Sequence, residues 1–134
     1  MKDIRANAIP GIQNGTLVNI VDNSGAKIAR VIAFRNYRGT CRRLQRGGIA
    51  SFCIVSVIRG NLELRKAKGV QYAIIVRQRG AIHRPNGERV CFEDNAGILT
   101  SKEGEPKGTM IRGVVAREAV LRWPTIGNLA TKIR

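Results

Sequence analysis

Few residues in this chain have the types and spacing that metal binding requires. Its single histidine is His83, and its three cysteines, Cys41, Cys53 and Cys91, form no Cys-x-x-Cys pair. Tetrahedral zinc sites need four such ligands at short spacings, so we expect no metal. Cys53 and Cys91 lie in apolar, strand-like segments and are predicted to be core thiols, whereas Cys41 lies among arginines in a predicted loop.

Acid–base catalysis has one candidate, the adjacent carboxylates Glu93 and Asp94. A strand end followed by a turn-forming Asp-Asn pair explains them without catalysis, and Asp22-Asn23 before Ser24-Gly25 has the same explanation. The sequence has no Walker-type phosphate loop and no Gly-x-Ser-x-Gly motif. We therefore predict that the chain is not an enzyme and has no catalytic residue, cofactor or small-molecule substrate.

The cationic side chains offer a different chemistry, the binding of a polyanion. Twenty-four Lys and Arg oppose nine Asp and Glu, which gives a formal net charge of +15 and a pI near 11.2. Arginine supplies 17 of the cations, and its planar guanidinium can grip phosphate with two donors and stack on bases. Positions 23–62 carry eight cations and no carboxylate. This balance favours a nucleic-acid partner and a molecule with one strongly positive side.

The cations fall into three clusters that we predict to contact RNA. The second is a basic loop with Arg59, Arg65, Lys66 and Lys68, and the third surrounds the predicted hairpin and contains Arg77, Arg79, His83, Arg84 and Arg89. Glycines within the first cluster, a loop over 35–48, would let the backbone approach a phosphate closely. Tyr37 is the one aromatic residue expected in a basic loop, because Phe34, Phe52, Tyr72 and Phe92 fall in apolar strands. We therefore expect recognition of folded RNA by shape and phosphate positions rather than by stacking of splayed bases. The candidate RNA-binding residues are Lys27, Arg35, Arg38, Arg42, Arg43, Arg46, Arg59, Arg65, Lys66, Lys68, Arg77, Arg79, His83 and Arg84, with Arg89 nearby.

The elements that must position these residues are short strands separated by glycine-containing turns. The apolar runs over 49–58 and 72–76 predict strands buried on both faces, which favours a small closed barrel. Closure also removes sheet edges that could pair with other chains. Asn86-Gly87 predicts a hairpin. The predicted strands cover 16–21, 28–34, 49–58, 70–76, 82–84, 89–92 and 97–100, and a basic loop is predicted over 61–69.

The C-terminal part is predicted to be helical. Residues 114–122 contain helix formers, with Glu118 and Arg122 at the i,i+4 spacing of a helical ion pair. Pro124 should end this helix at Trp123, because proline disfavours helical geometry in the residue before it. A second short helix is predicted over 125–133, with Thr125 as its cap.

Length and composition predict one domain over 1–134, with a barrel over about 15–113 and a helical region over about 114–134. A chain of this size can bury enough surface to fold without disulfides. No apolar run approaches the roughly 18 residues that a membrane helix needs, so no membrane partner is expected. The first fifteen residues show no signal or transit pattern, and we expect a cytoplasmic protein.

Six sequence blocks, in order along nearly the whole chain, are similar to those of a known family. They are VDNSGAK (21–27), AIIVRQR (73–79), IHRPNG (82–87), VCFEDNA (90–96), GEPKGT (104–109) and GVVARE (113–118). Together they resemble the universal uL14 family of large-subunit ribosomal proteins, in its archaeal and eukaryotic branch. Small departures are Gly97-Ile98, where the family more often has Ala-Val, and His83, where it often has Arg.

The resemblance implies a closed five-stranded barrel with a short helical C-terminal region, and direct binding to large-subunit rRNA. It also implies contact with neighbouring large-subunit proteins and a place at the intersubunit face, where small-subunit rRNA would form a bridge. Lys102, Lys107 and Thr109 would lie at that face. The segment 118–134, with Glu118, Arg122 and Trp123, would dock proteins, including an anti-association initiation factor. Lys27, Arg42, Arg43, Arg46, Arg77, Arg79 and Arg84 would grip rRNA phosphates.

Two alternatives share parts of this pattern. A general nucleic-acid-binding protein or RNA chaperone on the same barrel would have the charge without the specificity, and would bind duplex DNA and unrelated RNA comparably well. An enzyme acting on RNA would need a metal or an acid–base pair, for which Glu93 and Asp94 are the available carboxylates.

Overall fold

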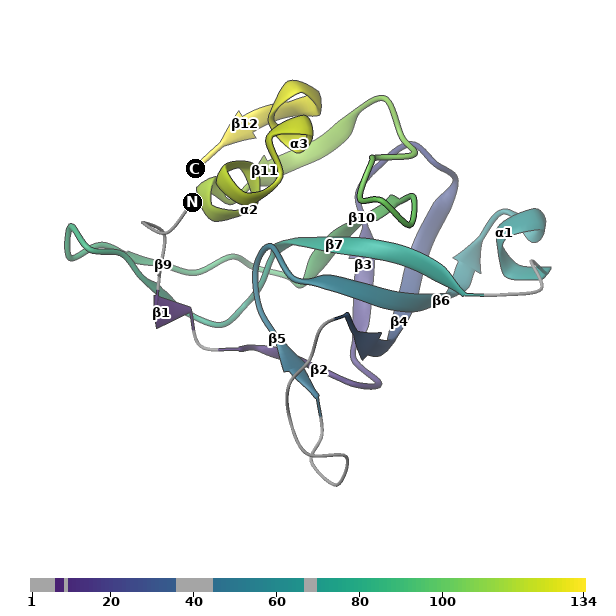
Figure 1. Cartoon of the computed structure of the whole chain (residues 1–134), viewed down its shortest axis with the longest axis horizontal. Coiled ribbons are helices and arrows are strands. Elements are labelled where there is room, and N and C mark those ends of the chain that lie inside the picture. Colours follow the sequence, from purple (N-terminus) through teal and green to yellow (C-terminus); the bar gives the residue numbers. More distant parts are fainter. Residues whose placement is uncertain (1–6, 9, 36–44, 67–69) are drawn as a thin grey trace.

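A closed five-stranded barrel forms the centre of the computed structural model, which describes residues 7, 8, 10–35, 45–66 and 70–134 (Figure 1). Parallel pairing joins only β10 to β3 within the barrel, and the other neighbours are antiparallel. The barrel confirms the predicted fold class. Its strands, in the order in which they pair, are β10 (Ala96–Thr100), β3 (Leu17–Ile20), β4 (Ala26–Phe34), β6 (Phe52–Gly60) and β7 (Gln71–Arg77).

Strand β7 separates two hydrophobic cores. Successive side chains of a strand point to opposite faces, and accordingly Ala73 and Ile75 pack inside the barrel while Ile74 and Val76 join a second core outside it. The second core is closed by residues of the C-terminal region, so all five residues of β10 are buried as well. The prediction that the run over 72–76 is buried on both faces is confirmed.

The apolar run over 49–58 is not a single strand. Its first residues form a turn in which the Ser51 amide donates to the Gly48 carbonyl, and Ala50 adopts a positive φ of 66°. Strand β6 begins only at Phe52. The Ala50 amide donates to the Ile75 carbonyl at 2.8 Å, so the turn is fixed against β7 rather than extended along β4.

The C-terminal region contains more strand than predicted. It consists of β11 (Ile111–Val115), α2 (Arg117–Arg122), α3 (Pro124–Leu129) and β12 (Ala130–Ile133), and β12 pairs in parallel with β11. The predicted helix start at Val114 is wrong, because this β-branched residue pairs with Lys132. Helix α2 does end at Arg122, as predicted. Thr125 lies inside α3, whose N-cap is Trp123, so the predicted threonine cap is wrong.

Smaller elements extend the barrel at opposite ends (Figure 1). The predicted hairpin is present as β8 (Ile82–His83) and β9 (Arg89–Val90), with Gly87 at a φ of 88°, and β1 (Asn7–Ala8) pairs with β8. Strand β2 (Ile12–Gln13) pairs with β5 (Arg46–Gly47). A short helix, α1 (Leu62–Lys66), occupies part of the segment predicted to be a basic loop.

Two cysteines lie within the described segments, and they differ in environment. Cys53 is fully buried, and burial raises the pKa of its thiol to about 12. Cys91 is exposed, so the prediction that it is a core thiol is wrong. The strand around it is short, ending at Val90, and this leaves Cys91 on a loop. Across the described ranges, no helix is both long and apolar enough to cross a membrane.

Candidate RNA-binding surface

One group of cations lies at the end of the barrel that carries α1. The pairing of β4 with β6 places Ile28 opposite Arg59, so Lys27 and Arg59 lie near the same end of the two strands. Helix α1 follows β6 directly, and the Asn61 amide at its start donates to the Gly25 carbonyl at 3.0 Å. The predicted RNA-binding residues that this end brings together, all exposed, are Lys27, Arg59, Arg65 and Lys66.

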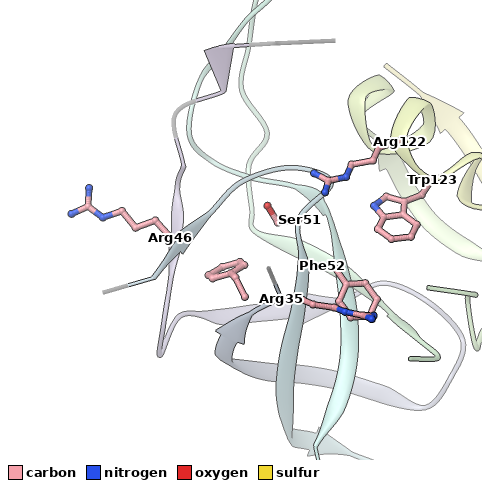
Figure 2. Close-up of a pocket in the computed structure, with 7 residues that line it drawn as sticks. Arg35, Arg46, Ser51, Phe52, Arg122 and Trp123 are labelled. Carbon is pink, nitrogen blue, oxygen red and sulfur yellow. The ribbon is translucent and has the colours of Figure 1, made fainter. Parts of the chain in front are cut away.

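A second group lies at the other end of β4. Arg35 directly follows β4, Arg46 lies on β5, and Arg122 ends α2, so three distant segments contribute one arginine each. They line a pocket of about 340 Å³ together with Phe34, Ser51, Phe52 and Trp123 (Figure 2). Sequence reasoning singled out the three arginines and Trp123 separately, but it contained no signal that Phe34 and Phe52 would border an opening.

The third predicted cluster is not a single basic patch. The Arg77 guanidinium pairs with the Asp94 carboxylate at 3.0 Å and donates to the Val114 carbonyl of β11 at 3.1 Å. Arg79 is exposed, and its Nε donates to the Glu93 carbonyl at 2.8 Å. These bonds hold the loop before β10 against the end of β7, so Arg77 has a structural role inside the protein.

Asp94 is likewise engaged rather than poised for catalysis. Partial burial raises the pKa of its carboxyl, but hydrogen bonds from Arg77 and Asn19 and the positive charge of Arg77 more than offset this, and the pKa is lowered overall. Its neighbour Glu93 is exposed. The two carboxylates therefore have the structural role expected of a strand end followed by a turn, in which Asp94 is bonded to Arg77 and Asn19. They do not form an acid–base pair.

Arg84 is the most deeply buried cation in the described part of the chain. Its Nε lies 2.8 Å from a Glu118 carboxylate oxygen, and its Nη2 donates to the same carboxylate at 3.3 Å and to the Arg134 carbonyl at 2.7 Å. The hydrogen bonds and charge of Glu118 raise the pKa of Arg84 despite an opposing effect of burial. An RNA contact for Arg84 stays a prediction. The geometry disfavours it, because the guanidinium donors already bond Glu118 and the Arg134 carbonyl and so hold the C-terminal region against the hairpin.

Glu118 was expected to pair with Arg122 along α2, and that expectation is wrong. The carboxylate turns inward to Arg84, whereas the Arg122 side chain extends toward the pocket (Figure 2). Near the hairpin, His83 accepts a long hydrogen bond of 3.4 Å from the exposed Arg89.

The loop between β10 and β11 borders the pocket end. The Lys102 carbonyl accepts a hydrogen bond of 2.7 Å from Arg35, and Lys107 donates to the Gln71 side chain at 2.6 Å. Thr109 is bound twice by Asn23, through its hydroxyl at 2.7 Å and its amide at 2.8 Å. The loop is therefore fixed to the barrel, with Lys102, Lys107 and Thr109 all exposed on it.

Four predicted RNA-binding residues, Arg38, Arg42, Arg43 and Lys68, lie outside the described residues, as do Tyr37 and Cys41. Within the described segments, ion pairs join only Arg77 to Asp94 and Arg84 to Glu88 and Glu118. The cations at both ends of β4 consequently keep their charge free for an outside partner. Over the same segments, no three His, Cys, Asp or Glu side chains gather as metal ligands would.

By its fold and its charge the protein belongs to the class of small, strongly basic closed barrels, and in the described part of the chain it carries cations without carboxylate partners at both ends of β4. The chain belongs to the family described as ribosomal protein L14p/L23e, whose family model matches residues 11–134. It is therefore a ribosomal protein with a structural role, not an enzyme, and the expected location at the cytoplasmic ribosome is confirmed.

Archaeal relatives support the same assignment. The chain is 45% identical to "Large ribosomal subunit protein uL14" of Sulfurisphaera tokodaii over 129 residues, which cover 96% of this chain and 92% of the relative. It is also 45% identical over 130 residues to the protein of that name from Methanococcus maripaludis, with 97% of each chain covered. The resemblance of the six sequence blocks to this family is thus confirmed.

Proposed function

We propose that this protein is a structural constituent of the large ribosomal subunit that binds large-subunit rRNA directly through the two ends of β4. The observation that carries the proposal is the distribution of charge. Among the described residues, exposed cations without carboxylate partners gather around α1 and around the pocket, whereas the partly buried Arg77 and the buried Arg84 are paired with carboxylates inside the protein. Preorganised cations at fixed positions match a fixed pattern of phosphates, which gives affinity and orientation without reading base sequence.

The loop between β10 and β11 is proposed to face the small subunit and to contact its rRNA at a bridge. Support comes from its rigidity, because hydrogen bonds to Arg35, Gln71 and Asn23 hold it while leaving the Lys102 and Lys107 side chains exposed. Neutralising both lysines should leave rRNA binding intact and weaken the association of purified subunits. Unchanged association would remove these lysines from the bridge.

The C-terminal region is proposed to contact neighbouring ribosomal proteins and an anti-association initiation factor. Exposed apolar side chains on it, Leu121 at 38% and Ile133 at 48% exposure, suit protein contacts. Glu118 is unsuited to direct docking, because its carboxylate is occupied by Arg84. Its contribution would be to hold the docking surface in place.

Filter binding tests the rRNA contact. The double variant Lys27→Gln/Arg59→Gln should bind large-subunit rRNA at least tenfold more weakly, and the slope of log affinity against log salt should fall by about 2. A matched control, Arg112→Gln/Lys132→Gln, removes two exposed charges from the C-terminal region and should change neither value. Equal losses in both variants would show that only net charge matters. Comparable wild-type affinity for duplex DNA would favour the RNA chaperone alternative.

A further inference from the structure

The pocket at the second end of β4 combines cations with aromatic rings. Its lining contains three arginines, three aromatic side chains and Ser51, and none of these described lining residues is a carboxylate. Its volume of about 340 Å³ lies within the range of small-ligand sites. The combination suits a ligand that is both anionic and flat.

The aromatic wall is rigid without a ligand. The Trp123 indole N–H donates to the Ala50 carbonyl at 3.0 Å, and its ring centroid lies 5.9 Å from that of Phe52. Gly104, at a φ of 96°, lies against the opposite part of the indole, where a Cβ atom would come within 2.5 Å of Cζ3. The ring is therefore held in one orientation before anything binds.

The arginines are positioned by the same surroundings. The Arg35 guanidinium carbon lies 5.2 Å from the Phe52 ring centroid, and its Nη1 donates to the Lys102 carbonyl. In the described part of the chain, Phe52 thus covers one face of the planar group and the Lys102 carbonyl takes one of its five donors. In Figure 2 the Arg122 guanidinium reaches toward Ser51, whereas that of Arg46 points away from the opening. Arg35 and Arg122 are therefore the two pocket arginines that do not point away from the opening.

We propose that this pocket binds a single unstacked nucleotide of the RNA partner. The phosphate would lie between Arg35 and Arg122, and the base would lie against Trp123 and the guanidinium plane of Arg35. Every base has a π face, so such a contact tolerates any sequence. An acidic peptide would satisfy the arginines but would offer no flat group to the aromatic wall.

The proposal rests on the proposed RNA-binding function and adds a stacking contact to it. The sequence predicts no such contact, because few aromatic residues fall outside the apolar strands. Phe34 and Phe52 are core residues, as expected, with exposures of 7% and 6%. Their edges nevertheless border the opening beside Trp123. A barrel that recognises phosphate positions would thereby also hold one nucleotide in a fixed orientation.

The intrinsic fluorescence of the full-length protein tests this directly, because Trp123 is the single tryptophan of the chain. A five-nucleotide oligouridylate should quench it in a saturable way, uridine monophosphate should do so more weakly, and inorganic phosphate should not. Arg122→Gln should weaken the oligonucleotide affinity five- to tenfold. The control Arg117→Gln, an exposed arginine of the same helix outside the pocket, should leave it unchanged.

Three outcomes would overturn the proposal. They are the absence of quenching by the oligonucleotide, equal quenching by a pentaglutamate peptide, and equal effects of the two arginine variants. Filter binding of rRNA by the same wild-type sample distinguishes a failure of the nucleotide-site proposal from a failure of the proposed rRNA-binding function. If rRNA is bound without any pocket signal, the nucleotide site is lost and the rRNA role stands; if rRNA itself is not bound, the proposed function fails.

Discussion

Replacing Glu118 by Gln should destabilise the protein strongly, although the residue lies on a short surface helix. The Glu118 side chain is 11% exposed and that of Arg84 is 6% exposed, so the substitution removes the nearer counter-charge of a buried guanidinium. The other carboxylate paired with Arg84, on the exposed Glu88, lies 3.7 Å away. Two hydrogen bonds between the side chains are weakened or lost with it, at 2.8 and 3.3 Å. The hydrogen bond from Arg84 to the Arg134 backbone oxygen, at 2.7 Å, is kept.

The expected magnitude follows from the burial of the pair. Removing one partner of a buried ion pair costs about 3–5 kcal/mol, because the other charge stays buried and uncompensated. Glutamine keeps one carbonyl acceptor, and Glu88 still lies 3.7 Å from Arg84, so we expect the lower end of this range, about 3 kcal/mol. That is a large part of the roughly 5–15 kcal/mol that holds a domain folded. For a chain of this length the corresponding fall in Tm is about 10–15 °C.

Urea unfolding followed by circular dichroism measures the free energy of unfolding, and Arg122→Gln is the matched control. Arg122 would be the partner if the pair ran along α2, but it is exposed and unpaired with Glu118. Its replacement should change stability by less than about 0.5 kcal/mol. Similar small losses of about 0.3–0.5 kcal/mol in both variants would indicate an i,i+4 surface pair between Glu118 and Arg122 instead. They would refute the buried ion pair between Arg84 and Glu118.

Three further substitutions or labelling experiments probe other parts of the fold. The pKa of Asp94 is lowered in the folded protein, so its carboxylate stabilises the fold at pH values above the ordinary pKa of 3.8. This contribution is lost as the pH falls through the folded pKa, and Asp94→Asn should therefore flatten the decline of Tm below about pH 4. Mass mapping after iodoacetamide treatment should find native Cys91 alkylated and Cys53, whose pKa is about 12, protected until unfolding; equal rates would contradict the burial. Gly104→Ala should cost about 1–3 kcal/mol and shift Trp123 emission to longer wavelength, and an unshifted spectrum would show that the indole is not held there.

The barrel could be predicted from the sequence because its determinants are local. Alternating apolar residues and glycine-containing turns mark strands such as β4 and the β8–β9 hairpin, and the continuous run over 72–76 correctly indicates burial on both faces. The errors occur where contacts distant in sequence decide the structure. Val114 and the residues of β12 become strand because they pair with each other, and no pattern within either segment shows this.

The candidate site shows the same division. Composition was enough to predict a polyanion partner, since the charge belongs to the whole chain. Composition could not show which cations are neutralised inside the protein, because the carboxylates that bond Arg77 and Arg84 most closely, Asp94 and Glu118, lie 17 and 34 positions away in sequence. Nor could it show the pocket, whose lining comes from residues 34–35, 46, 51–52 and 122–123.

Sedimentation of a cell lysate through a gradient containing high salt, with detection of this protein in each fraction, tests the central claim most directly. A structural constituent of the large subunit, held by many fixed phosphate contacts, should remain with the large subunit and with whole ribosomes. If the protein moves to the top of the gradient while other large-subunit proteins stay in place, it is a loosely bound nucleic-acid-binding protein, and direct, fixed binding to large-subunit rRNA is contradicted.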